Sequence, residues 1–138
     1  LEIIPISVKT KQEIPYVGSQ ISAGFPSPAE DFGDSAIDLN EALIKNKHTT
    51  FFGRVKGESM KDAGLSDGDL LVIDKSLPPV NGKIAVCFLD GEFTVKTVEI
   101  RAGNLWLVPA NVNYKPIKVN EENEFLIWGI VTYVVKAL

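Results

Sequence analysis

From residue 50 onward, short apolar runs alternate with turn dipeptides, and this pattern most constrains the fold. Asp90-Gly91 separates the run 83–89 from the run 92–100, and Asp-Gly between two such runs is a strong hairpin signal. Asp67-Gly68 and Asn81-Gly82 precede further strand-like runs. The predicted strands cover residues 51–55, 69–74, 83–89, 92–100, 104–109 and 125–135. Many short strands with regular turns predict a compact, mostly β, barrel-like domain.

The first part of the chain has a different pattern. Residues 1–28 show little helical periodicity and contain four prolines, so we expect an extended N-terminal arm there. Asp38 fits a helix N-cap and Glu41 follows three residues later, which predicts one short helix over about 39–46. The expected organisation is therefore an arm, 1–28, followed by a β-rich domain, 29–138.

Composition narrows the class of protein. The 138 residues are 45% hydrophobic and 23% charged, as in a globular domain. A net charge of −4 without a basic cluster argues against strong direct binding to nucleic acid, which needs positive charge to neutralise phosphates. The single cysteine, Cys87, fits a reducing compartment. No signal peptide is visible and the apolar run 125–135 is too short to span a membrane, so we expect a cytoplasmic protein.

Metal and cofactor sites are not expected. One histidine and one cysteine cannot form a structural zinc site. Four aspartates lie close together in sequence, but their spacing fits no calcium loop, and turn or surface positions explain them better; they are Asp62, Asp67, Asp69 and Asp74. His48 lies in a polar segment typical of a surface histidine, and no Gly-rich phosphate loop opens a helix.

Ser59 and Lys96 are the candidate chemical groups. Lys96 lies inside a strand-like run with apolar neighbours, and burial would lower its pKa and favour the neutral amine. If Ile100, on the same predicted face, is inside, Lys96 is at least partly inside as well. A neutral lysine can take the proton of a serine hydroxyl, as in Ser-Lys hydrolases. Taken separately, however, Ser59 fits a turn that caps backbone groups, and Lys96 fits an edge lysine that reaches solvent.

Several motifs in order carry a resemblance to a known family. They are Gly24-Phe25-Pro26-Ser27-Pro28, Ile37-Asp38-Leu39-Asn40, Gly57-Glu58-Ser59-Met60, Ser66-Asp67-Gly68-Asp69-Leu70-Leu71, Asp90-Gly91-Glu92-Phe93-Thr94-Val95-Lys96 and Val134-Val135-Lys136-Ala137. From about residue 20 to its end, the chain resembles the LexA/UmuD family of self-cleaving Ser-Lys peptidases.

The resemblance implies a mostly β peptidase domain with a mobile arm. It implies that Ser59 is the nucleophile, that Lys96 is the general base, and that the backbone N–H groups of Glu58 and Ser59 form the oxyanion hole. It implies a cut between Ala23 and Gly24, stimulated by RecA filaments on single-stranded DNA after DNA damage. The trimmed homodimer would then join a UmuC-like subunit as part of an error-prone translesion polymerase.

Alternatives remain at this stage. The chain could be the self-cleavage and dimerisation domain of a LexA-like or phage-type repressor, which a helix-turn-helix region before Leu1 would indicate. If Ser59 and Lys96 are far apart or inert, we expect a non-catalytic β binding module instead.

The run 125–135 is apolar on both faces, which predicts either a central strand or one covered by a partner. The resemblance favours a homodimer contact near the C-terminus.

Overall fold

The computed structural model describes residues 1–8, 11–15, 23–25 and 36–138. These residues divide into two compact parts. The larger part contains Leu1–Ile6 and Asn46–Leu138, and the smaller part is Ser7–Lys45. The predicted arm, 1–28, is therefore shared between the two parts, because its first six residues belong with the larger one. The predicted boundary at residue 28 lies outside the described residues.

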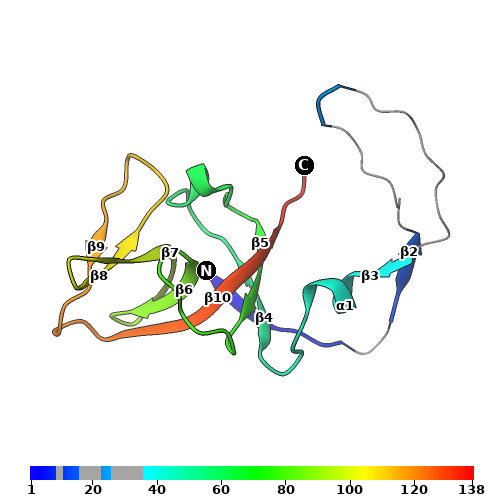
Figure 1. Cartoon of the computed structure of the whole chain (residues 1–138), viewed down its shortest axis with the longest axis horizontal. Coiled ribbons are helices and arrows are strands. Elements are labelled where there is room, and N and C mark those ends of the chain that lie inside the picture. The colour runs from blue at the N-terminus through cyan, green and yellow to red at the C-terminus, as the bar shows by residue number, and fades with distance from the viewer. Residues whose placement is uncertain (9–10, 16–22, 26–35) are drawn as a thin grey trace. The chain divides into compact units, whose positions relative to one another are not determined.

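An eight-stranded antiparallel sheet forms the larger part, in the order β1-β4-β5-β10-β6-β7-β8-β9 (Figure 1). The strands are β1 Glu2–Pro5, β4 Thr50–Arg54, β5 Leu70–Asp74, β6 Ile84–Leu89, β7 Glu92–Arg101, β8 Asn104–Val108, β9 Ile117–Lys118 and β10 Phe125–Val135. The mostly β prediction is confirmed. Because β1 and β9 are its two edge strands, the sheet is open rather than a closed barrel.

The β6–β7 hairpin forms as predicted. Asp90 and Gly91 have φ angles of 48° and 90°, the left-handed backbone that a two-residue hairpin turn requires. Leu89 then pairs with Glu92. Because β6 and β7 are thereby in a fixed register, Ala85 lies opposite Lys96.

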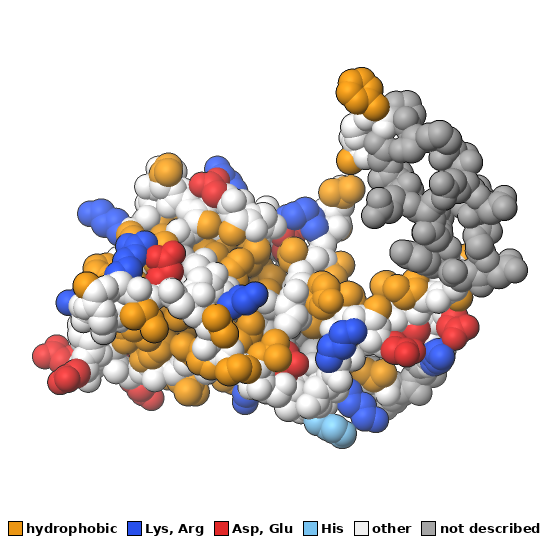
Figure 2. All heavy atoms as spheres, in the orientation of Figure 1, with side chains coloured by type: hydrophobic (Ala, Val, Ile, Leu, Met, Phe, Trp, Pro, Cys, Tyr) orange, Lys and Arg blue, Asp and Glu red, His pale blue; other side chains and the backbone are white. Residues whose placement is uncertain are grey.

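Two clusters of buried side chains form the core. Val86 belongs to the first and Ala85 and Cys87 to the second, so the clusters lie on opposite faces of β6. Leu71 and Ile73 of β5 add fully buried side chains to the first cluster. Figure 2 shows that apolar side chains also reach the surface of the larger part among the charged ones.

Strand β10 runs through the middle of the sheet, between β5 and β6, as the central-strand alternative predicted. Its last residues are nevertheless open to solvent: Tyr133, Val134 and Val135 are 42%, 40% and 47% exposed. The strand is thus internal along much of its length and carries an uncovered apolar end.

The smaller part contains strand β2 (Glu13–Pro15), paired antiparallel with β3 (Ala36–Asp38), and helix α1 (Leu39–Leu43). The Asp38 carboxylate accepts a hydrogen bond from the Asn40 N–H and caps the helix, as predicted. The helix is shorter than the predicted 39–46, because Ile44 adopts an extended conformation and ends it. Among the described residues, no helix has the length and hydropathy needed to cross a membrane.

Candidate active site

Ser59 lies in a tight turn that follows β4. Gly57 has a φ of 90°, and its N–H donates to the Asp67 carboxylate at 2.7 Å. On the other side, Met60 is only 2% exposed, and its carbonyl accepts from the N–H groups of Ala63 and Leu65. Ser59 therefore lies between Gly57, whose backbone is in the left-handed region, and the buried Met60, and its own side chain is half-buried.

Lys96 comes from the middle of β7 and is only 8% exposed. The condition from which its burial was expected is not met, since Ile100 is 60% exposed. Lys96 is buried because the middle of β7 is covered on both faces, as the low exposure of Val95 and Val98 shows.

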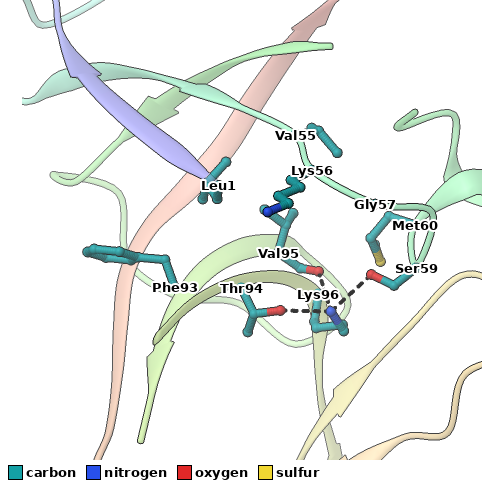
Figure 3. Close-up of a pocket in the computed structure, with 10 residues that line it drawn as sticks. All are labelled: Leu1, Val55, Lys56, Gly57, Ser59, Met60, Phe93, Thr94, Val95 and Lys96. Atoms are coloured by element: carbon teal, nitrogen blue, oxygen red, sulfur yellow. Dashed lines mark hydrogen bonds between the residues drawn. The ribbon is translucent and has the colours of Figure 1, made fainter. Parts of the chain in front are cut away.

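The fold joins the two candidate residues directly, as Figure 3 shows. The Lys96 amine donates to Ser59 Oγ at 3.0 Å, to Thr94 Oγ1 at 2.7 Å and to the Val95 carbonyl at 3.1 Å. All three acceptors are uncharged. Within the described part of the chain, no Asp or Glu side chain forms an ion pair with Lys96. Ser59 and Lys96 are therefore not far apart, which was one of the two conditions for expecting a non-catalytic binding module.

Burial lowers the pKa of Lys96, because the ammonium loses its water without gaining an anionic partner; the negative charge of a Cys87 thiolate would raise that pKa to a lesser degree. The same burial raises the pKa of Cys87 to about 12, against the opposing effect of the Lys96 charge. The thiol thus stays protonated while the lysine is pushed towards its neutral form.

The neutral amine has two N–H groups and one lone pair. If the N–H groups keep their bonds to Thr94 Oγ1 and the Val95 carbonyl, the lone pair is left facing Ser59 Oγ. The hydroxyl can then donate its proton to the amine. The arrangement can therefore activate a serine nucleophile without a histidine or a carboxylate.

The Glu58 and Ser59 carbonyl groups of the turn also accept hydrogen bonds. The Glu58 carbonyl accepts from the Lys61 N–H and from the Asn111 side chain, and the Ser59 carbonyl accepts from the Ala110 N–H. The two bonds to the Glu58 carbonyl fix the peptide unit that contains the Ser59 N–H, one of the two predicted oxyanion donors.

A pocket opens beside the pair, as Figure 3 shows. Its lining residues are Leu1, Val55, Lys56, Gly57, Ser59, Met60, Phe93, Thr94, Val95 and Lys96. In the parts of the chain described, no cluster of three or more His, Cys, Asp or Glu residues could hold a metal ion.

The predicted cleavage residues, Ala23 and Gly24, belong to the smaller part and are exposed. A Cβ atom at Gly24 would meet no described atom within 4 Å. Pro26, Ser27 and Pro28 of the predicted motif lie outside the described residues.

Sequence reasoning missed two residues of this site. Thr94 stands two residues before Lys96, so strand alternation puts both on one face, and that spacing could have indicated it. Asn111 has no comparable local signal, because its partner, Glu58, is 53 residues away in sequence.

Comparison with known proteins supplies the family. The pattern described as Peptidase S24-like matches residues 15–132. The chain belongs to the peptidase S24-like family. MucA of Salmonella typhimurium is 40% identical over 121 residues, which cover 87% of this chain and 82% of MucA. SamA of the same species is 38% identical over 132 residues, which cover 96% and 91%.

The S24-like match and the UmuD-like relatives confirm the resemblance that the motifs predicted. The chain is a self-cleaving serine peptidase of SOS mutagenesis. The LexA repressor of Alcanivorax borkumensis is also similar, at 38% identity over 120 residues, but these residues cover only 57% of that protein.

Proposed function

We propose that this S24-like peptidase cuts its own Ala23–Gly24 bond with Ser59 as the nucleophile and Lys96 as the general base. The observation that carries the proposal is the 3.0 Å contact between the buried Lys96 amine and Ser59 Oγ. Burial lowers the pKa of this lysine, and a proton acceptor in direct contact with a serine hydroxyl is what acyl transfer requires.

The reaction proceeds in two steps. The Ser59 hydroxyl gives its proton to the Lys96 amine while Oγ attacks the Ala23 carbonyl carbon. The resulting oxyanion accepts hydrogen bonds from the backbone N–H groups of Glu58 and Ser59. The carbon–nitrogen bond to Gly24 then breaks, and the Lys96 ammonium protonates the leaving amine. Water, deprotonated by the neutral lysine, hydrolyses the Ala23 ester and frees Ser59.

The exposed Ala23–Gly24 segment supports its role as the substrate. Small side chains on both sides of a bond let the backbone approach a nucleophile closely. The cut separates residues 1–23 from the remainder of the chain. Because Glu2–Pro5 form the edge strand β1, the first residues would then be held by non-covalent contacts alone, namely the pairing with β4 and the packing of Leu1 and Ile3 against the core.

We further propose that the trimmed protein acts as a homodimer with a UmuC-like polymerase subunit in the cytoplasm. The exposed apolar end of β10 supports self-association, since such side chains favour a covered surface. The similarity to MucA and SamA, over 82% and 91% of those proteins, supports this assignment. A RecA filament on single-stranded DNA would act by favouring the arm position competent for cleavage.

The experiment is intact mass over time for the purified chain at neutral and alkaline pH, beside Ser59→Ala and Lys96→Ala. We expect a new species that begins at Gly24 in the wild-type chain and in neither variant. No cleavage at any pH, even with RecA, single-stranded DNA and ATP, would contradict the proposed reaction. Cleavage restored by RecA in Lys96→Ala would contradict the role given to the lysine.

A further inference from the structure

The loop between β8 and β9 is attached to the Ser59 turn by three hydrogen bonds. The Ala110 N–H donates to the Ser59 carbonyl at 2.8 Å, and the Asp62 N–H donates to the Ala110 carbonyl at 2.7 Å. The third bond comes from a side chain: Asn111 Nδ2 donates to the Glu58 carbonyl at 2.8 Å. Of the three, it is the bond that a substitution can remove without changing the backbone.

The Asn111 amide is held at both ends. Its Oδ1 accepts from the Asn113 N–H at 3.0 Å while its Nδ2 reaches the Glu58 carbonyl. An amide that uses its oxygen and its nitrogen in this way has one orientation that satisfies both partners. The two hydrogen bonds therefore hold the Asn111 side chain in one orientation, unlike a freely rotating surface side chain.

Fixing the Glu58 carbonyl also fixes the Ser59 N–H. The two groups belong to one planar peptide unit and, in a trans peptide, point in opposite directions. No peptide bond in the described ranges is cis. A carbonyl that accepts a hydrogen bond also polarises its peptide unit, which makes the N–H a better donor. The Glu58 carbonyl also accepts from the Lys61 N–H, at 3.2 Å, but the Asn111 bond is the shorter of the two, at 2.8 Å. Asn111 thus contributes to both the direction and the donor strength of the Ser59 N–H.

We propose that Asn111 is a positioning residue for self-cleavage, which aims the Ser59 N–H at the oxyanion by holding the Glu58 carbonyl. This inference rests on the proposed function, in which that N–H stabilises the tetrahedral intermediate. The residue acts through the peptide unit, since its amide donates to the Glu58 carbonyl rather than to Ser59 Oγ or the Lys96 amine.

Asn111→Asp and Asn111→Ala test the inference together. Aspartate has the same shape and keeps the acceptor for Asn113, but it places an acceptor oxygen against the Glu58 carbonyl. Alanine removes the donor without adding charge. Asn123 provides the matched control, because its Nδ2 donates to Asp90 and its Oδ1 accepts from the Asn120 N–H in another loop.

The first-order rate of self-cleavage is measured by intact mass from neutral to alkaline pH, together with the thermal midpoint. Losing an oxyanion donor typically lowers the rate about 10²- to 10³-fold, so a misdirected donor should lower the plateau rate by at least about tenfold. We expect this loss in both Asn111 variants and in neither Asn123→Asp nor Asn123→Ala. In Asn111→Ala the apparent pKa of the pH profile should stay at the wild-type value, which separates positioning of the oxyanion donor from an effect on Lys96.

Plateau rates within twofold of wild type in both Asn111 variants would overturn the inference while leaving the Ser-Lys mechanism intact. An equal loss in the Asn123 variants, or a loss that follows a fall in thermal midpoint, would also overturn it, because the effect would then be structural. Absence of cleavage in the wild-type chain, or cleavage of the Ser59→Ala variant, would instead overturn the proposed function.

Discussion

The pH dependence of self-cleavage follows from the burial of Lys96 and can be worked out in advance. An ordinary lysine has a pKa of about 10.4, so roughly one molecule in a thousand carries the neutral amine at pH 7.4. Burial lowers the pKa of Lys96, and each unit of lowering makes the neutral form about tenfold more abundant at that pH. The rate should therefore rise about tenfold per pH unit and reach its plateau clearly below pH 10.4.

The assay is the first-order rate of appearance of the Gly24 species, from pH 6 to about 11, at one ionic strength. Lys96→Met should abolish the pH-dependent phase, since the base is gone. Lys83→Met, at an exposed lysine, should leave the profile unchanged. A rate that keeps climbing through pH 10.4 would refute the argument from burial, and a flat profile would refute the lysine base itself.

Three further predictions concern the groups around the site and the core. Thr94→Val removes an acceptor that stabilises the Lys96 ammonium, so the pKa of Lys96 should fall further and the amine should become a weaker base. In the same mass assay the plateau of the pH profile should begin at lower pH, and the plateau rate should be about tenfold lower than in the wild-type chain. The Lys136 ammonium and then the Ser66 N–H hold the pKa of Asp69 below its usual range. The stability that the Asp69 carboxylate adds to the folded state is therefore complete above about pH 4 and is lost as the pH falls through the folded-state pKa. Asp69→Asn should accordingly lower the free energy of unfolding by about 1–3 kcal/mol at pH 7 in urea titrations, and the difference should shrink on acidification. Gly129→Ala would place a Cβ atom 2.7 Å from Cγ2 of Ile73, and overpacking of this kind should cost about 1–3 kcal/mol by the same titration. An unchanged unfolding midpoint for Gly129→Ala would show that the sheet relaxes around the added methyl group.

Residues close together in sequence gave the most reliable predictions. The Asp90-Gly91 hairpin and the Asp38 helix cap depend on contacts within a few residues, and both are confirmed. The helix end was predicted less well. Its early stop at Leu43 comes with a competing turn, in which the Asn46 side chain accepts from the His48 N–H.

The sequence by itself determined six of the strands, the main hairpin and the candidate serine and lysine, because alternation, turn residues and motifs are local properties of a chain. The short strands β1, β2, β3 and β9 were not predicted. Only the tertiary structure decided that Ser59 and Lys96 touch, although 37 residues separate them. It also brought Asn111 to the Glu58 carbonyl, across 53 residues. Contacts of this range depend on the register and order of eight strands, and neither quantity is written in any single segment. The physical reason is that the Lys96 amine reaches Ser59 Oγ only once the sheet has brought β7 beside the turn that follows β4.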